Sequence, residues 1–204
     1  MNLNLDYKNN ISKLLELSLN NENYELEVLF NSIKTINITQ FNNIYNRLTK
    51  LYGNCDKYPK SLDIILTDYK SNKITVIGEE NILNYYKTNK LSYESISIIE
   101  KKRVINNKKY IDNIILTDYD CKVKLREENI IDNSAKKVEL FKKINELGKL
   151  FRFKQRFSFF TPDKFFRFDL TIVKCNDKFS NSLKDANIFK SKEVYEVELE
   201  FIGN

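Results

Sequence analysis

Five short segments of the chain alternate between charged and apolar residues, and these charges are the side chains best able to do chemistry. Glutamates take alternate positions in two of the segments, at 24–30 (YELEVLF) and at 195–201 (YEVELEF). Basic residues do the same at 121–127 (CKVKLRE) and 151–157 (FRFKQRF), whereas 166–173 (FRFDLTIV) carries both signs. Because side chains alternate across a β-strand, each segment predicts a strand with one apolar and one charged face.

Two architectures explain such two-faced strands. The first is an ordinary antiparallel sheet with one solvated face, but solvated faces usually mix charges, and here acid and base are largely segregated by strand. Like charges two residues apart repel each other and become tolerable when strands of opposite sign face them. The second architecture, which we favour, is an α+β fold built on a closed antiparallel β-barrel of about eight strands, with the charges in its lumen. The outward apolar faces then need helices packed outside.

Such a lumen would bring carboxylates and cations together. The acids expected to point inward are Glu25, Glu27, Asp169, Glu196, Glu198 and Glu200. The cations expected to join them are Lys73, Lys122, Lys124, Arg126, Arg152, Lys154, Arg156 and Arg167. Clustered carboxylates are the hard oxygen ligands that Mg²⁺ or Mn²⁺ prefers. The cations suit phosphate oxygens, which arginine binds bidentately, so a divalent metal and a triphosphate would balance the two sets.

The rest of the composition excludes most other catalytic chemistry. The chain has no His, which removes Ser-His-Asp and Cys-His catalysis, a His general base and His-ligated zinc. The only Gly-Lys pair, Gly148-Lys149, lacks the preceding glycine of a P-loop. The cysteines, Cys55, Cys121 and Cys175, form no Cys-x-x-Cys motif and lack the arginine of a cysteine phosphatase. Catalysis must therefore rest on carboxylates, Lys, Arg and bound metal.

Residue periodicity predicts the elements that would position these side chains. Helical spacing predicts helices at 11–19, 39–51, 79–88 and 135–149. Two-residue spacing predicts strands at 24–31, 62–69, 72–78, 94–103, 110–119, 121–129, 151–160, 164–174 and 193–202. The hexapeptide IILTDY occurs at 64–69 and again at 114–119, each time before a strand with basic positions. The repeat predicts two similar hairpins in one sheet, although chance in a biased composition explains it nearly as well.

Length and charge set the wider expectations. The 204 residues are predicted to form one domain, 1–204, with a helical N-terminal segment at 1–22. The net charge of +6 favours polyanions such as nucleic acid, although an AT-rich genome raises the lysine count in the same way. No apolar run approaches the ~20 residues of a membrane helix, and the N-terminus does not read as a signal peptide. We therefore expect an intracellular protein in a reducing compartment, without a membrane partner.

The alternating segments resemble the motifs of a known enzyme family. They are similar to the metal-dependent RNA 5′-triphosphatases of fungi, protozoa and large DNA viruses, which belong to the triphosphate tunnel metalloenzymes. The glutamates at 25–27 and 196–200 stand where that family has its two glutamate strands. The segment at 167–173 resembles its Arg-x-Asp-Leu-Thr strand, and KITV at 73–76 resembles its Arg-Val-Thr strand. The motif order matches, and the resemblance is nearest to giant-virus capping enzymes, in which this domain precedes a guanylyltransferase.

The resemblance implies a role for each charged strand. It implies a metal held by Glu25, Glu27, Glu196 and Glu200. It implies a γ-phosphate clamp of Arg152, Lys154 and Arg156, and Lys73 stands where the family has an arginine. Lys124 is a further candidate catalytic residue. Glu198 with Asp169 would orient the attacking water, and Arg167 would support both carboxylates through salt bridges.

The activity implied by the resemblance is removal of the γ-phosphate from 5′-triphosphate RNA, with Mg²⁺ or Mn²⁺ as the cofactor. This reaction is the first step of mRNA cap formation, and a metal-dependent NTPase side activity accompanies it. The implied partners are the 5′-triphosphate end of nascent RNA and a fused or associated guanylyltransferase. The chain stops four residues after Glu200, so we expect the N-terminal domain of a longer capping enzyme. It would work in the host cytoplasm or the virion if viral, and otherwise in the nucleus.

Two alternatives remain open from the sequence. An enzyme of the same fold would hydrolyse inorganic tripolyphosphate or thiamine triphosphate, because a tunnel contacts only the triphosphate tail. A non-catalytic basic RNA-binding module would instead stack bases on Tyr and Phe. Most of these rings fall on the apolar side of the predicted strands, where a core role fits them better.

Overall fold

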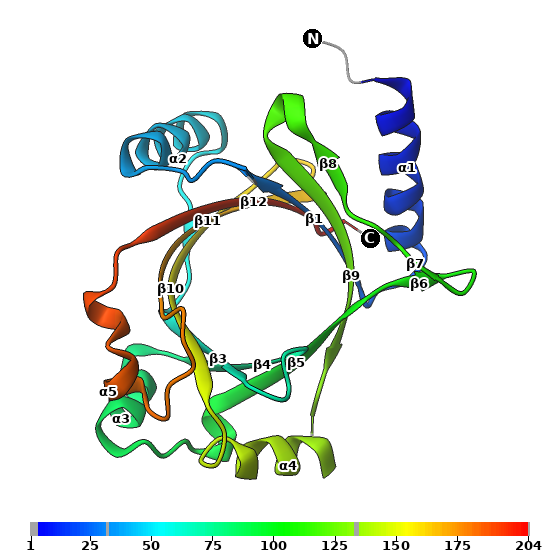
Figure 1. Ribbon diagram of the computed structural model, residues 1–204. Helices are drawn as coiled ribbons and strands as arrows, with labels where there is room; N and C mark the ends of the chain where they lie inside the picture. The colour runs from blue at the N-terminus through cyan, green and yellow to red at the C-terminus, as the bar shows by residue number, and fades with distance from the viewer. Residues whose placement is uncertain (1–3, 32, 133–134, 204) are drawn as a thin grey trace.

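A closed ring of antiparallel strands forms the centre of the computed structural model, which describes residues 4–31, 33–132 and 135–203 (Figure 1). The eight strands of the ring, in spatial order, are β1 (Tyr24–Phe30), β12 (Val194–Phe201), β11 (Phe166–Cys175), β10 (Lys149–Phe160), β3 (Ser61–Leu66), β4 (Asn72–Ile77), β5 (Ile96–Arg103) and β9 (Cys121–Ile130). β1 pairs with β9 along the whole length of β1, so the ring closes without a free edge. The predicted barrel is confirmed.

Shorter strands extend this sheet. β3 and β4 form one hairpin, and β8 (Ile114–Leu116) forms another with β9. Both copies of IILTDY therefore run from the end of a strand into the turn of a hairpin, and both hairpins belong to the same sheet, as the repeat predicted. β2 (Asp56–Lys57) pairs with β10, while β6 (Ile105–Asn106) and β7 (Lys109–Tyr110) make a separate hairpin that projects from the ring (Figure 1).

The strand predicted at 110–119 is wrong in extent. Only Ile114–Leu116 is a strand of the main sheet, followed by a 3-10 turn at Thr117–Tyr119. The start of the segment is fixed by side chains, since Arg103 Nη2 donates to Asp112 Oδ1 and Arg126 Nη2 donates to Asn113 Oδ1. These contacts hold the backbone at 112–113 in a loop between the projecting hairpin and β8.

Helices cover the outside of the ring (Figure 1). They are α1 (Leu5–Leu19), α2 (Ile38–Tyr52), α3 (Glu79–Thr88), α4 (Ala135–Lys143) and the single turn α5 (Leu183–Ala186). α1 begins earlier than its apolar periodicity predicted because Asn4 caps it, accepting a hydrogen bond from Asp6 N. α4 ends earlier than predicted, at Lys143, because the chain must turn into β10, which already starts at Lys149.

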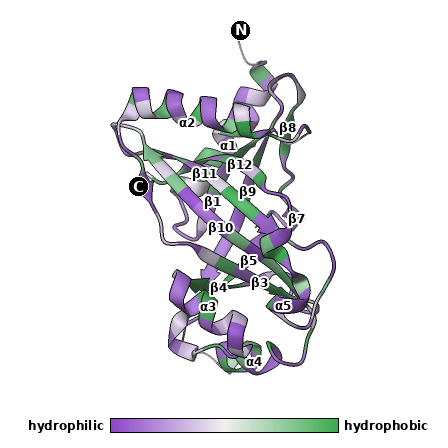
Figure 2. Ribbon diagram, turned by 90° about the vertical axis from the view of Figure 1, so that its left-hand side faces the viewer, coloured by the Kyte–Doolittle hydropathy of each residue, from purple (hydrophilic) through white to green (hydrophobic). Residues whose placement is uncertain are grey.

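The apolar faces of the strands point outward and pack under these helices. Leu14 of α1 packs on Leu26 and Leu125, and Phe41 of α2 packs with Leu170. The largest cluster lies between β3, β4 and β5 and the helices α3, α4 and α5. Each fully buried Leu or Ile contributes roughly 1.5–3 kcal/mol to burial free energy, so the wall is stabilised from outside and the lumen is left to charged residues. Figure 2 shows the same mixture of apolar and polar residues along single strands.

No helix in the described part of the chain combines the length and the apolarity needed to cross a membrane.

Candidate active site

The ring encloses a cavity of about 500 Å³ whose wall is mostly charged. Its acidic side chains are Glu25, Glu27, Asp63, Glu128, Glu196, Glu198 and Glu200. Its basic side chains are Lys70, Lys73, Lys101, Lys124, Arg152, Lys154, Arg156 and Arg167. Both signs, contributed by different strands, thus face one enclosed space.

Three neighbouring strands build the acidic side of the cavity. Glu27 of β1 lies opposite Glu200 of β12, and Glu198 of β12 lies opposite Asp169 of β11. Cβ atoms of opposite residues in an antiparallel pair are about 4.5–5.5 Å apart, so the strand register alone brings these carboxylates together.

Burial and mutual repulsion disfavour the charged forms of two glutamates on this side of the cavity. Burial raises the pKa of Glu200 to about 7, with Arg167 opposing the rise and Glu25 adding to it. The pKa of Glu198 is also raised, first by burial and then by Glu27. A further cation near these two glutamates would therefore stabilise their charged forms.

Asp169 lies behind the cavity wall and holds two arginines. Its side chain is 1% exposed, and its oxygens lie 3.0 Å from Arg156 Nη1 and 3.0 Å from Arg167 Nε. The Ser158 hydroxyl donates to the same carboxylate at 2.5 Å. A buried carboxylate with three donors is fully engaged, so Asp169 fixes the directions in which Arg156 and Arg167 point.

This arrangement corrects one expectation about the salt bridges of Arg167. Arg167 pairs with Asp169, as expected, but its second partner is Glu200 and not Glu198. Glu198 is approached by Arg156 instead, at 3.8 Å. The reason is register, because Arg167 lies directly opposite Glu200 across the β11–β12 pair. Asp169 is not part of the cavity lining, because it lies beneath Arg156 and Arg167, which are part of it.

A second buried carboxylate, Asp63 of β3, organises the basic side. Lys154 Nζ lies 2.5 Å from Asp63 Oδ2, and the Thr75 hydroxyl donates to Asp63 Oδ1 at 2.9 Å. Burial alone would raise the pKa of Asp63, but the attraction of Lys154 and Lys73 outweighs burial and lowers it.

The lysines next to Asp63 carry more positive charge than one carboxylate can balance. Burial lowers the pKa of Lys154, and that of Lys73, against the pull of Asp63, and Arg156 lowers both further by repulsion. The Lys73 side chain forms no ion pair or hydrogen bond with another described residue. An anion in the cavity would relieve this excess of positive charge.

Other charges in the cavity wall pair between strands. Arg152 Nη2 binds both oxygens of Glu196, at 2.7 and 2.8 Å. Lys124 Nζ lies 3.3 Å from Glu27 Oε1 on the adjacent strand. These pairs are accessible enough to exchange a partner for a ligand, since the Arg152 and Glu196 side chains are 36% and 33% exposed.

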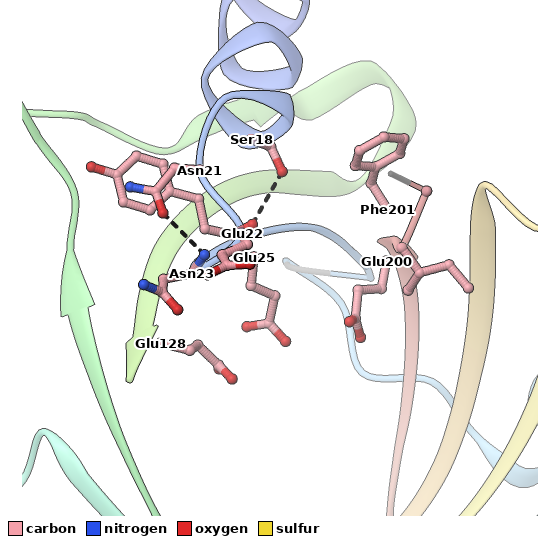
Figure 3. A pocket seen from close by; sticks show the side chains of 11 residues that line it. Ser18, Asn21, Glu22, Asn23, Glu25, Glu128, Glu200 and Phe201 are labelled. Atoms are coloured by element: carbon pink, nitrogen blue, oxygen red, sulfur yellow. Dashed lines mark hydrogen bonds between the residues drawn. The ribbon is translucent and has the colours of Figure 1, made fainter. Parts of the chain in front are cut away.

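Beside this cavity lies a second one of about 300 Å³, which shares Glu25, Glu128 and Glu200 with it (Figure 3). The three carboxylates point into a common space next to the end of α1 (Figure 3). Lys101 Nζ lies 2.7 Å from Glu25 Oε2 and also contacts Glu128. Gly203 lines the smaller cavity too, so this end of the tunnel is acidic and lies near the end of the chain.

Most residues selected from the sequence meet in this site. All of the residues expected to bind metal or phosphate, or to orient water, line the main cavity, except Asp169 behind its wall. Lys122 and Arg126, also expected to point inward, are not part of the lining. Arg126 donates to the Leu125 carbonyl and to Asn113, which draws its guanidinium away from the cavity.

Sequence reasoning missed Asp63, Lys101 and Glu128. Asp63 is a single acid in the apolar strand SLDIIL, and its position alternates with Leu62 and Ile64. A lone carboxylate in such a strand is a signal in itself, because burial of an unpaired charge is costly. Glu128 extends the alternation of β9 by one step, whereas Lys101 stands in a continuous charged run at 100–103 of β5, where no alternation marks it.

The carboxylates on the acidic side suit a hard divalent cation by their chemistry. Glu25, Glu27 and Glu200 offer only oxygen ligands, and because burial raises the pKa of Glu200, a bound cation would favour its charged form. Within the described residues, no three acidic or thiol side chains lie close enough together to enclose a metal as they stand. In this structure Lys101, Lys124 and Arg167 engage these three carboxylates instead.

Comparison with known proteins identifies the fold. No family model matches the sequence, and no curated protein matches it. Among solved structures, the RNA triphosphatase domain of the trifunctional mimivirus mRNA capping enzyme superposes with a TM-score of 0.71 at 24% identity, covering 99% of this chain and 91% of that one. A second crystal form of the mimivirus capping enzyme triphosphatase gives 0.70 at 21% identity, covering 98% and 90%.

The likeness extends to a fungal structure. The RNA triphosphatase of S. pombe superposes with a TM-score of 0.59 at 13% identity, covering 98% of this chain and 80% of that one. At these identities the likeness establishes the architecture, a closed eight-stranded barrel with a tunnel. What the tunnel does in this chain must be argued from its own residues.

Proposed function

We propose that this chain is a metal-dependent RNA triphosphatase, which removes the γ-phosphate from 5′-triphosphate RNA to leave a 5′-diphosphate end. The observation that carries the proposal is the single cavity in which an acidic β1–β12 wall faces cations from β10, β4 and β11. The same barrel in the mimivirus and S. pombe structures, both RNA triphosphatases, supports the choice of substrate.

The cations in the cavity would bind the triphosphate. Arg152, Lys154 and Arg156 project from alternate positions of β10, so their side chains form a row along one face of the strand. Such a row suits the linear chain of phosphates in the substrate. Lys73 adds a buried positive charge from the opposite side of Asp63. Binding by these groups stabilises charge on the transferring phosphoryl oxygens, where most catalysis of phosphoryl transfer originates.

The carboxylates would serve the metal and the water. Glu25, Glu27 and Glu200 would hold Mg²⁺ or Mn²⁺, which supplies charge withdrawal from the phosphate oxygens when bound. Glu198, on the same face of β12, would orient the water that attacks the γ-phosphorus in line with the leaving diphosphate. Glu196, first grouped with the metal ligands, would instead orient Arg152, because that arginine already binds both of its oxygens.

Asp169 and Asp63 would act as positioning residues beneath the phosphate-binding cations. Asp169 fixes Arg156 and Arg167, and Asp63 fixes Lys154. Neither carboxylate needs to touch the substrate for this role. Their effect is to hold the donors in place before the reaction, which lowers the cost of reorganisation.

Phosphate release from triphosphate-ended RNA tests the proposal. With Mg²⁺ or Mn²⁺ present, we expect release of one phosphate per RNA end, and we expect EDTA to abolish it. ATP should be hydrolysed as a side activity. Parallel assays on inorganic tripolyphosphate decide between the RNA enzyme and a small-triphosphate hydrolase of the same fold. The proposal would be contradicted if none of these substrates released phosphate.

The activity belongs to the first step of mRNA cap formation. The mimivirus structure is a domain of a trifunctional capping enzyme, and we propose that this chain likewise works with a fused or associated guanylyltransferase. A viral origin, with action in the host cytoplasm or the virion, is consistent with that relative. Co-purification of guanylyltransferase activity with the natural full-length protein would test the association.

A further inference from the structure

The hairpin β6–β7 projects from the ring without being part of its wall (Figure 1). Its turn residues, Asn107 and Lys108, have φ angles of 50° and 63°, which is typical of a tight two-residue hairpin. Its base is anchored, since Val104 is 1% exposed and its carbonyl accepts a hydrogen bond from Ile111 N at 2.9 Å. A fixed hairpin of this kind presents its side chains to solvent in a defined place.

The side chains of the hairpin are of the types with which proteins bind single-stranded nucleic acid. Lys108 and Lys109 are exposed and form no ion pair with any residue the structure describes. Tyr110 is 60% exposed, and the Arg103 guanidinium lies 5.0 Å from the centre of its ring. Asp112 Oδ1 holds that guanidinium at 2.9 Å. Free cations beside an oriented aromatic ring suit backbone phosphates and a stacked base, respectively.

The hairpin also continues a line of basic residues that starts inside the tunnel. Lys101 of β5 lines the cavity, and Arg103 follows on the same face of the strand, roughly 7 Å further along. The part of the acidic cavity lined by Gly203 lies away from the hairpin, since Figure 2 places the C-terminus and β7 on opposite sides of the molecule. A polyanion would therefore leave the tunnel more favourably on the side of the hairpin.

We infer that the β6–β7 hairpin, with Arg103, binds the nucleotides that follow the 5′-triphosphate of the RNA. The inference rests on the proposed function and adds to it the path of the RNA chain. Lys108 and Lys109 bind backbone phosphates, and the open face of Tyr110 stacks on a base. The hairpin gives the enzyme a preference for an RNA end over a free triphosphate, which the tunnel alone does not provide.

Binding measurements on a hairpin variant test this directly. The variant combines Lys108→Asn, Lys109→Gln and Tyr110→Ala, with Asn chosen because it tolerates the positive φ at 108. The probe is a fluorescent 12-nucleotide single-stranded RNA with a 5′-triphosphate, measured by anisotropy without hydrolysis in EDTA. We expect the affinity to fall by about tenfold or more, from the lost stacking and two lost phosphate contacts. The salt dependence of binding should become shallower by about 1.4 log units per log unit of salt.

Two controls separate this inference from the proposed function. Lys87→Gln with Lys90→Gln removes two exposed charges from the region of α3, across the ring from the hairpin, and should leave RNA affinity within about twofold. The hairpin variant should keep its affinity for inorganic tripolyphosphate, which has no chain to reach the hairpin. Unchanged RNA affinity in the hairpin variant, or an equal loss in the α3 variant, would overturn the inference. A protein that binds RNA through the hairpin but releases no phosphate would refute the proposed function alone.

Discussion

At the scale of single residues, the charged cavity depends on two buried carboxylates. Asp169 and Asp63 are each 1% exposed, yet each is surrounded by cations that it holds in place. Burying an ionised carboxylate is costly unless it is paired and hydrogen-bonded. Both residues meet that condition, and their removal should therefore affect stability and catalysis together.

Replacing Asp169 tests the first of these carboxylates. In Asp169→Asn, Arg156 and Arg167 lose their common anion, and we expect the free energy of unfolding in urea to fall by about 3 kcal/mol. Turnover should fall by about 10²-fold, because the arginines are no longer held toward the phosphate. Asp118→Asn, at an exposed carboxylate outside the site, is the matched control and should change neither value appreciably.

The lowered pKa of Asp63 predicts that the free energy of unfolding depends on pH. Its pKa is lower in the folded chain than in the unfolded one, so the unfolded state binds more protons and stability rises with pH in that range. The contribution of Asp63 is fully present above the unfolded pKa of about 3.9 and is lost as pH falls through the folded value. Between pH 5 and pH 3, Asp63→Asn should therefore lose less stability than the parent protein. Parallel curves for the two proteins would show that Asp63 is not stabilised as described.

At the scale of elements, alternation in the sequence predicted the strands well because charge and apolar character serve opposite faces of the same wall. β12 carries Glu196, Glu198 and Glu200 inward, and Val197 and Leu199 outward, as its sequence indicates. What alternation could not provide was the register between strands. The pairing of Arg167 with Glu200, for example, depends on how β11 and β12 are aligned.

The structure of segments whose side chains are held by distant residues also could not be predicted from the sequence. The segment at 110–119 looked like a strand, but Arg103 and Arg126 fix its start in a loop. Asp63 was overlooked because its charged partner, Lys154, comes from β10, far along the chain. Such contacts exist only once the ring has closed.

The N-terminus of α2 offers a test at this scale. Asn37 and Gln40 form a capping box, in which each side chain accepts a hydrogen bond from the backbone N–H of the other. Asn37→Ala should lower the free energy of unfolding by about 1 kcal/mol. Asn43→Ala, at an exposed position inside the same helix, should leave stability unchanged or raise it slightly. Neither change should alter phosphate release, because α2 packs outside the wall.

At the scale of the whole molecule, the barrel has its hydrophobic core on the outside and its chemistry inside. Core side chains such as Phe151 and Leu62 are 0% exposed between the wall and the helices. The cavity wall, by contrast, contributes little apolar burial, so many of its charges can change without loss of the core. Stability and activity should therefore separate by the face on which a residue lies.

This separation is measurable with one residue on each face of β10. Phe151→Ala removes a buried ring and should cost about 3–5 kcal/mol of unfolding free energy. Arg152→Ala, next along the strand but facing the cavity, should lower stability by less than about 1 kcal/mol, since its pair with Glu196 is partly exposed. Equal losses from both variants in urea unfolding would contradict a core that lies only outside the ring.

The measurement that tests the account most directly is a double-mutant cycle within the cavity wall, read out as phosphate release from triphosphate-ended RNA with Mn²⁺. Glu198 of β12 and Arg156 of β10 approach each other to 3.8 Å, and Glu198→Ala and Arg156→Ala should each lower turnover by ~10²-fold or more in a folded protein. Because both act on one bound triphosphate, the double variant should lose little more than the worse single variant. Near-normal turnover in either folded single variant would contradict the account.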